Sequence, residues 1–180
     1  MSSDAAGAAQ AVAPPKAAFD FDSAFHANYE RISRVIVRVL GDPARAEDLA
    51  VEAFWRLWRS PNAHNDAHAG WVYRTAVRLA LDELRRRARR QRYERALTVF
   101  RGPRTPHDAY ASTEEQRRVR EVLAAITRKH AVMLVLQSDG ASYEEIAAAA
   151  SVNPSSVGTL LARARQAFRK EYVRRHGERS

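Results

Sequence analysis

Apolar side chains recur at helical spacing along the first half of the chain. One face of a first helix is formed at steps of three or four residues by Phe25, Tyr29, Ile32, Ile36 and Val39. Gly41 and Pro43 are expected to close this helix. A second helix has an apolar face made of Ala46, Leu49, Ala50, Ala53 and Leu57, and Ser60-Pro61 should stop it.

A third long helix is predicted from Trp71 into an arginine-rich stretch. On a helical wheel, one narrow stripe within about 80° holds Arg74, Arg78, Asp82, Arg85 and Arg89. Most of the remaining circumference is apolar, so this helix should be wedged into a bundle and show a mainly cationic stripe. An ion pair between Arg78 and Asp82, four residues apart, is an alternative role for Arg78.

Residues 62–70 are a loop by composition. His64 and His68 are spaced like a metal pair, but without a helix or a third ligand we interpret them as solvated loop histidines. The helical spacing of apolar residues is interrupted again by Gly102, Pro103 and Pro106. We therefore interpret residues 96–113 as a linker.

The second half predicts a smaller helical unit. Residues 114–126 carry one apolar face, and the wholly apolar run 131–137 is a buried helix or strand, of which its helical neighbours favour the helix. Ser142 with Glu145 is spaced like a capping box for a helix over 143–150. Asn153 and Pro154 should begin the last helix. The helix over 143–150 and this last helix together form a helix-turn-helix.

These patterns predict an all-α fold of two small helical domains, residues 19–95 and 114–175, joined by a flexible linker. The Ala-rich residues 1–18 lack the features of a signal peptide and are interpreted as a disordered tail. The chain holds no run of apolar residues long enough to span a membrane, so no membrane insertion is expected.

The charge is concentrated in two patches. The chain of 180 residues has a formal net charge of +9 and no cysteine. Residues 71–95 hold nine arginines against three acidic residues, and residues 154–175 are also strongly basic. Two patches on a near-neutral background favour two contacts with a polyanion, although an arginine-rich soluble surface is the alternative. The absence of cysteine fits a reducing cytosol and excludes disulfides and thiolate metal sites.

Three segments together resemble the bacterial sigma-70 factors of the extracytoplasmic-function (ECF) type, which carry sigma regions 2 and 4. The segments are "LGDPARAEDLAVEAFWRLW", "WVYRTAVRLALDELRRRARR" and "ASYEEIAAAASVNPSSVGTLLARARQAFR". The resemblance covers roughly residues 21–172, with residues 19–95 as region 2 and 114–175 as region 4. It implies a cytoplasmic sigma factor that binds core RNA polymerase, recognises promoters and helps to open DNA, without catalysis, cofactor or metal of its own.

The resemblance implies a polymerase-binding surface on the second helix, which docks on the β′ clamp coiled coil. The residues opposite the apolar stripe are Asp48, Val51, Glu52 and Trp55. Exposed carboxylates beside a large aromatic residue suit a protein interface. Alternatively, Trp55 packs inside its own domain. The family usually has Gln where Val51 stands.

The resemblance also implies two DNA contacts. Capture of the −10 element would fall to the third helix, through Trp71, Arg74, Arg78, Arg85, Arg86 and Arg89. The −35 element would be bound by the last helix, through Ser155, Ser156, Thr159, Arg163 and Arg165. The family commonly has Asn at position 78 and basic residues at 158 and 160, so base choice should differ and the last helix should position the protein more than it specifies sequence.

Further partners implied by the resemblance are the polymerase β flap, which region 4 contacts, and an anti-sigma factor as a candidate regulator. Two other classes of protein remain as alternatives. An autonomous helix-turn-helix regulator would need dimerisation and would leave region 2 without a purpose. A nuclease using Asp82 and Glu83 is disfavoured because adjacent carboxylates on a helix point about 100° apart.

Overall fold

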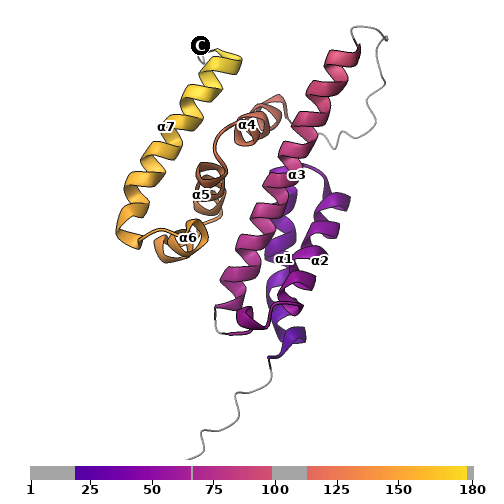
Figure 1. The fold of residues 1–180 in the computed structure, drawn as a ribbon, viewed down its shortest axis with the longest axis vertical. Helices are drawn as coiled ribbons and strands as arrows, with labels where there is room; N and C mark the ends of the chain where they lie inside the picture. The colour runs from indigo at the N-terminus through magenta and orange to yellow at the C-terminus, as the bar shows by residue number, and fades with distance from the viewer. Residues whose placement is uncertain (1–18, 66, 99–112, 178–180) are drawn as a thin grey trace, which may run out of the picture.

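The computed structural model describes residues 19–65, 67–98 and 113–177. These residues form seven α-helices and two short 3₁₀ turns, and contain no β-strand (Figure 1). The helices are α1 (Phe21–Leu40), α2 (Pro43–Trp58), α3 (His68–Thr98), α4 (Glu114–Ala125), α5 (Arg128–Ser138), α6 (Tyr143–Ala150) and α7 (Val157–His176). The all-α prediction is confirmed. The predicted N-terminal tail and residues 99–112 of the predicted linker lie outside the described residues.

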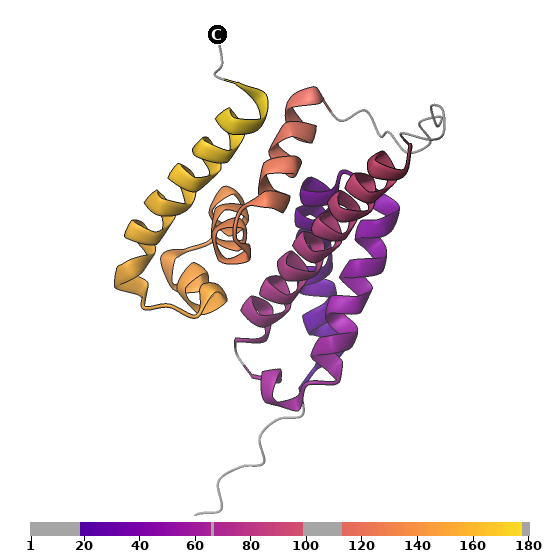
Figure 2. The same ribbon diagram turned by 45° about the horizontal axis from the view of Figure 1, so that its top comes forward.

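Helices α1, α2 and α3 lie side by side and form the first bundle (Figures 1 and 2). The turn between α1 and α2 is tight because Gly41 adopts a left-handed conformation with φ of 67° and donates its N–H to the carbonyl of Val37. Asp42 then caps α2 by accepting a hydrogen bond from the Arg45 N–H at 3.0 Å. Pro43 therefore begins the second helix and does not belong to the end of the first.

Helix α3 starts earlier than its apolar pattern indicates, at His68 in place of Trp71. The side chain of Asn65 accepts a hydrogen bond from the N–H of Ala67 at 2.9 Å, and its carbonyl accepts one from the N–H of His68. These bonds satisfy backbone groups that a helix start leaves free, so the helix can begin within the predicted loop. His64 stacks on Phe19, with ring centroids 4.3 Å apart, and its Nε2 donates a hydrogen bond to the carbonyl of Leu57 at 2.8 Å.

Helices α4 to α7 form the second bundle. The apolar run 131–137, for which the sequence allowed a helix or a strand, lies in α5. Its buried residues include Ala131, Met133 and Leu136 on different sides of the helix. The capping box between Ser142 and Glu145 is present at the start of α6. The last helix differs from its prediction at its start, because a 3₁₀ turn at Pro154–Ser156 precedes α7.

The two bundles share one apolar core. Helices α4, α5 and α6 all contact α3, and buried residues of both bundles join a single hydrophobic cluster. Figure 1 shows the second bundle lying along the side of α3. The hydrophobic pattern predicts two helical units but not this contact, because an amphipathic pattern does not tell which neighbour covers a face.

Candidate nucleic-acid and polymerase interfaces

The arginine stripe of α3 faces the second bundle along part of its length. Arg78 donates to the carbonyl of Ala149 at 2.8 Å, and Arg85 donates to the carbonyl of Ile126 at 2.9 Å. Asp82, between them on the stripe, pairs with Arg128 at the start of α5. The alternative of an Arg78–Asp82 ion pair is therefore wrong within the described residues: Asp82 takes its cation from another helix.

Burial also changes the electrostatics of this stripe. Desolvation lowers the pKa of Arg74, and the neighbouring charge of Arg78 lowers it further. Desolvation likewise lowers the pKa of Arg85, with a smaller contribution from Arg128. Clustered cations that are partly removed from water gain from a nearby anion, so the stripe is suited to phosphate.

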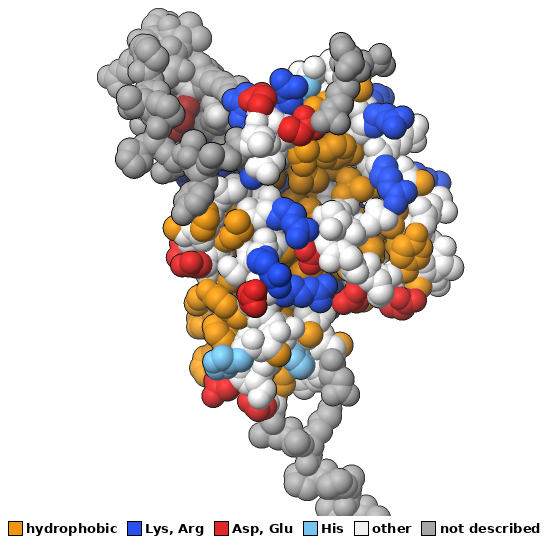
Figure 3. Space-filling model, turned by 180° about the vertical axis from the view of Figure 1, so that it is seen from behind, with side chains coloured by type: hydrophobic (Ala, Val, Ile, Leu, Met, Phe, Trp, Pro, Cys, Tyr) orange, Lys and Arg blue, Asp and Glu red, His pale blue; other side chains and the backbone are white. Residues whose placement is uncertain are grey.

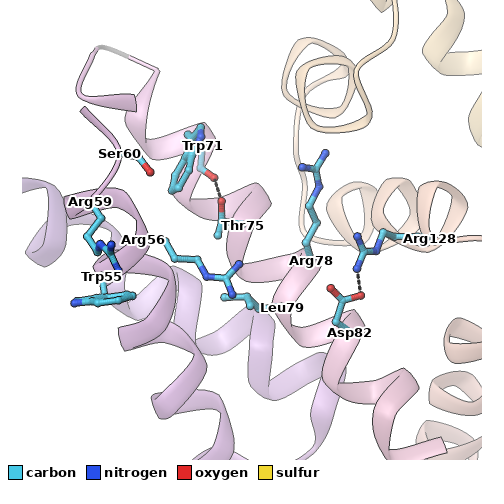
Figure 4. A pocket seen from close by; sticks show the side chains of 10 residues that line it. All are labelled: Trp55, Arg56, Arg59, Ser60, Trp71, Thr75, Arg78, Leu79, Asp82 and Arg128. Carbon is cyan, nitrogen blue, oxygen red and sulfur yellow. Dashed lines mark hydrogen bonds and ion pairs between the residues drawn. The ribbon is translucent and has the colours of Figure 1, made fainter. Parts of the chain in front are cut away.

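A hollow of about 540 Å³ opens beside the stripe. It is lined by Trp55, Arg56, Arg59, Ser60, Trp71, Thr75, Arg78, Leu79, Asp82 and Arg128 (Figure 4). The guanidinium of Arg59 lies over the ring of Trp55, 4.6 Å from its centroid. Aromatic rings beside several guanidinium groups suit an unstacked nucleobase and its phosphates, because bases stack on aromatic faces and phosphates pair with arginine.

Arg86 is bound by Glu83, a buried carboxylate whose structural role the sequence pattern did not predict. Glu83 is 8% exposed and accepts hydrogen bonds from Arg86 and, at 3.1 Å, from Arg87. Burial raises the pKa of Glu83, but the hydrogen bonds and charges of these arginines, with Arg45, outweigh it and lower the pKa below its ordinary value. The spacing of Glu83 to Arg86 and Arg87, three and four residues, is the signal that could have indicated this cluster.

The last turns of α3 extend past α1 and α2 (Figure 1). Arg89, Arg90 and Arg92 are exposed there, and Tyr93 is 68% exposed. The predicted contact Arg89 thus lies on an open cationic part of the helix, apart from Arg74 and Arg78 near its start. Basic and aromatic side chains on one open surface are typical of nucleic-acid binding.

The exposed face of α2 carries the residues assigned to polymerase binding. Asp48 is exposed and Glu52 partly exposed, with Glu52 paired to Arg56 at 2.6 Å. Val51 is 54% exposed and Trp55 is 52% exposed, so the alternative that Trp55 packs inside its own domain is wrong. Trp58 was not among the residues predicted for this surface; it is 60% exposed and follows Trp55 by three residues on the same helix.

In the second bundle, the start of α7 is open. Ser155, Ser156, Thr159 and Arg163 are exposed. Arg165 is also exposed, but it lines a groove with Val119, Leu123, Leu134, Val135, Ser138, Phe168 and Arg169. Two residues along a helix turn by about 200°, so Arg163 and Arg165 lie on opposite flanks of α7. The structure therefore separates two residues that were assigned to one DNA contact.

Figure 3 shows basic side chains gathered near the middle of the rear face, with acidic side chains between and beside them. Across the described residues, no cluster of three or more His, Asp or Glu side chains could hold a metal ion. None of the described helices combines the length and the apolar character that crossing a membrane requires.

Comparison with known proteins assigns the family. The family model of sigma-70 region 2 matches residues 24–90. The chain is 30% identical to the ECF RNA polymerase sigma factor SigK of Mycobacterium sp. (strain JLS), covering 81% of this chain and 80% of SigK. It is 26% identical to the ECF RNA polymerase sigma factor SigW of Bacillus subtilis, covering 79% of this chain and 83% of SigW. It is 29% identical to SigE of Mycolicibacterium smegmatis, of which it spans 62%.

The fold has a counterpart among solved structures. The sigma factor RpoE of Bartonella quintana, crystallised with the anti-sigma factor NepR, matches with a TM-score of 0.52 at 16% identity, covering 86% of this chain and 97% of RpoE. The fold and the region 2 match define a protein of the sigma-70 class. The chain belongs to the extracytoplasmic-function sigma factors of RNA polymerase.

Proposed function

We propose that the chain binds core RNA polymerase, directs it to promoters and helps to open the DNA. The observation that carries this proposal is the hollow beside α3, where Trp71 and four arginines lie next to the exposed face of α2. Aromatic and cationic groups together suit single-stranded DNA, which is the form that promoter opening produces. The chain supplies binding and leaves the chemistry to the polymerase, which acts in the cytoplasm.

Polymerase binding is assigned to the exposed face of α2. Val51, Trp55 and Trp58 form an apolar row, and Asp48 and Glu52 lie beside it. A large exposed apolar patch flanked by charges is typical of a protein interface. The groove lined by Leu123, Phe168 and Arg165 is a second apolar surface, and we assign it to the β flap.

Capture of the −10 element is assigned to α3 and the hollow. Arg78 lines the hollow with Trp71, and Arg74 lies near Arg78 on the same stripe. Arg85, Arg86 and Arg89 follow along the helix. Each guanidinium can bind phosphate through charge-assisted hydrogen bonds, which makes binding salt-dependent. Trp71 lines the hollow and can stack on an extruded base.

The −35 contact is assigned to the start of α7. Ser155, Ser156 and Thr159 are small and exposed, so the backbone there can approach DNA closely. Gly158 adds no side chain to this turn, and a methyl group there would make an ordinary contact of 3.8 Å with the ring of Tyr143. Arg163 is the long side chain on this flank that can reach a base or a phosphate.

Run-off transcription with bacterial core polymerase, followed by mapping of start sites, tests the proposal. We expect the protein to co-elute with core polymerase and to direct initiation at a defined set of promoters. The alternative, an autonomous helix-turn-helix regulator, is not favoured by the sigma factor relatives. Retarded migration of duplex DNA by the free protein, without co-elution with polymerase, would establish the regulator.

A further inference from the structure

A pocket of about 410 Å³ shares no described lining residue with the hollow beside α3. Its walls come from the end of α1, the turn into α2, α4 and the end of α5. Arg120 of α4 stands in the wall, so we call this cavity the Arg120 pocket. Its size and mainly apolar lining are typical of small-molecule sites. The apolar residues that line it are all aliphatic: Val37, Val39, Pro43, Val119, Leu123 and Val135.

Arg120 is a partly buried cation whose charge no carboxylate of the described residues balances. Its Nε is buried and has no hydrogen-bond acceptor among these residues. Desolvation lowers the pKa of its guanidinium, and no neighbouring negative charge raises it again. By contrast, Arg117 and Arg118 on the same helix both pair with Glu114, at 2.7 and 3.2 Å. Arg120 therefore bears a desolvation cost without the ion pair that its neighbours have.

The backbone beside Arg120 offers only a partial negative charge. Its guanidinium lies against Gly41, where a β carbon would come within 2.5 Å of Nη2 of Arg120, so the absence of a side chain permits this approach. Gly41 caps the C-terminus of α1, and a helix C-terminus carries at most about half of an elementary negative charge. The guanidinium is therefore left without a full counter-ion.

The two other charged side chains that line the Arg120 pocket have partners elsewhere. Arg38 pairs with Asp139 at 3.1 Å. Glu115 accepts a hydrogen bond from the hydroxyl of Tyr172 on α7 at 3.0 Å. The charge that is left unbalanced in the pocket is therefore positive, which favours a ligand with an anionic group.

We propose that the Arg120 pocket binds a small amphipathic anion, namely a carboxylate on an aliphatic chain. The terminal nitrogens of Arg120 hold the carboxylate through charge-assisted hydrogen bonds. The chain lies among the aliphatic side chains of the wall, where its apolar surface is removed from water. A nucleotide is a poorer fit, because none of the described lining residues is aromatic and a base has no ring to stack on.

The probe for this site is octanoate, with octanol and acetate as matched compounds. Octanol has the chain without the charge, and acetate has the charge without the chain. Isothermal titration calorimetry on the full chain should give octanoate a dissociation constant on the order of 0.1 mM, as expected of a small ligand. Octanol and acetate should each bind at least about tenfold more weakly, because each lacks one of the two interactions.

Arg120→Gln tests the cation, and Arg117→Gln is its matched control. Both substitutions remove one positive charge from α4, but the side chain of Arg117 is 60% exposed and pairs with Glu114. Octanoate should bind Arg120→Gln about tenfold more weakly than the parent, since a charge-assisted contact is lost, and should bind Arg117→Gln as it binds the parent.

Two further measurements on the same proteins examine the premise and the place of binding. Arg120→Gln should unfold at or above the temperature of the parent, because it removes a cation that lacks a counter-ion. Octanoate should raise the unfolding temperature of the parent and of Arg117→Gln only. In amide chemical-shift mapping, octanoate should shift the signals of Gly41 and Gln116, which line the pocket, and not that of Gly158 on α7.

Equal affinity of octanoate for the parent and for Arg120→Gln would overturn the assignment of the cation, and equal affinity of octanol and octanoate would overturn the anionic ligand. Shifts confined to residues outside the pocket would show adventitious binding to the basic surface and overturn the site. Unfolding of Arg120→Gln far below the parent would show that the guanidinium is already satisfied. The inference goes beyond the proposed function, and none of these outcomes depends on transcription.

Discussion

Glu83 and Arg87 lie one helical turn apart on α3, with the Nε of Arg87 3.1 Å from Glu83 Oε1. The other end of the same guanidinium reaches Asp42, the cap of α2, at 2.8 Å. Arg87 thus links a buried carboxylate on α3 to the start of α2. Arg87 therefore has a structural role within the basic cluster of α3. Among the contacts of the described residues, its neighbours Arg89 and Arg90 make no such link between helices.

This relationship predicts a pH-dependent loss of stability. Glu83→Gln should lower the free energy of unfolding by about 1–3 kcal/mol at neutral pH, because three arginines lose a charged acceptor. The pKa of Glu83 is depressed in the folded state, so its contribution is complete above the unfolded value of about 4.3 and is lost as pH falls through the folded pKa. The difference between variant and parent should therefore shrink below about pH 4.

Urea denaturation at several pH values measures this effect. Glu47→Gln is the matched control, because Glu47 is an exposed glutamate on α2. A constant difference between Glu83→Gln and parent at all pH values would show that the cluster stabilises by packing and not by charge.

Promoter opening should depend on the first two arginines of the α3 stripe. Arg74→Ala combined with Arg78→Ala should reduce permanganate reactivity of unpaired thymines near the start site, while co-elution with core polymerase is kept. The reason is that both guanidinium groups lie on the stripe assigned to single-stranded DNA, whereas the polymerase surface lies on α2. Arg34→Ala on α1, with its side chain 68% exposed, is the control. Unchanged reactivity in the double variant would remove this pair from the −10 site.

The two arginines on opposite flanks of α7 should differ in their effect on the −35 element. Arg163→Ala should weaken binding to the −35 element by about 1–3 kcal/mol if the side chain contacts a base. If it binds phosphate, binding should weaken uniformly across promoter sequences. Arg165→Ala should leave the preference for an intact over a scrambled −35 element unchanged, because Arg165 faces the groove with Phe168. Run-off transcription from paired promoters compares the two variants. Equal loss of the −35 preference in both would contradict their assignment to different surfaces.

Polymerase affinity should depend on the exposed tryptophan of α2. Trp55→Ala should weaken binding to core polymerase by about 2 kcal/mol, or roughly thirtyfold in Kd, as expected for an aromatic anchor at an interface. Its folding should change little, because the side chain is already half exposed. Tyr93→Ala, which removes an exposed aromatic residue from the far end of α3, serves as control in the absence of DNA. Fluorescence anisotropy with labelled protein gives both constants, and equal values for the two variants would exclude Trp55 as the anchor.

The sequence by itself determined the helices and the family. Apolar spacing, the left-handed Gly41 and the capping box of Ser142 with Glu145 are local signals, since each depends on residues within about one or two helical turns. The same signals placed Val51, Trp55 and Arg163 on exposed faces. They missed the early start of α3, because Asn65 satisfies free amides with its own side chain and backbone.

Only the tertiary structure decided what the polar side chains meet. Tyr73 and Asp139 are 66 residues apart, Arg78 and Ala149 are 71 apart, and Asp82 and Arg128 are 46 apart. A helical wheel assigns a side chain to a face but does not tell which helix covers that face. The contact of the second bundle with α3 depends on burial summed over many apolar residues from distant segments. Because of this contact, arginines of the stripe lie against protein and not against solvent.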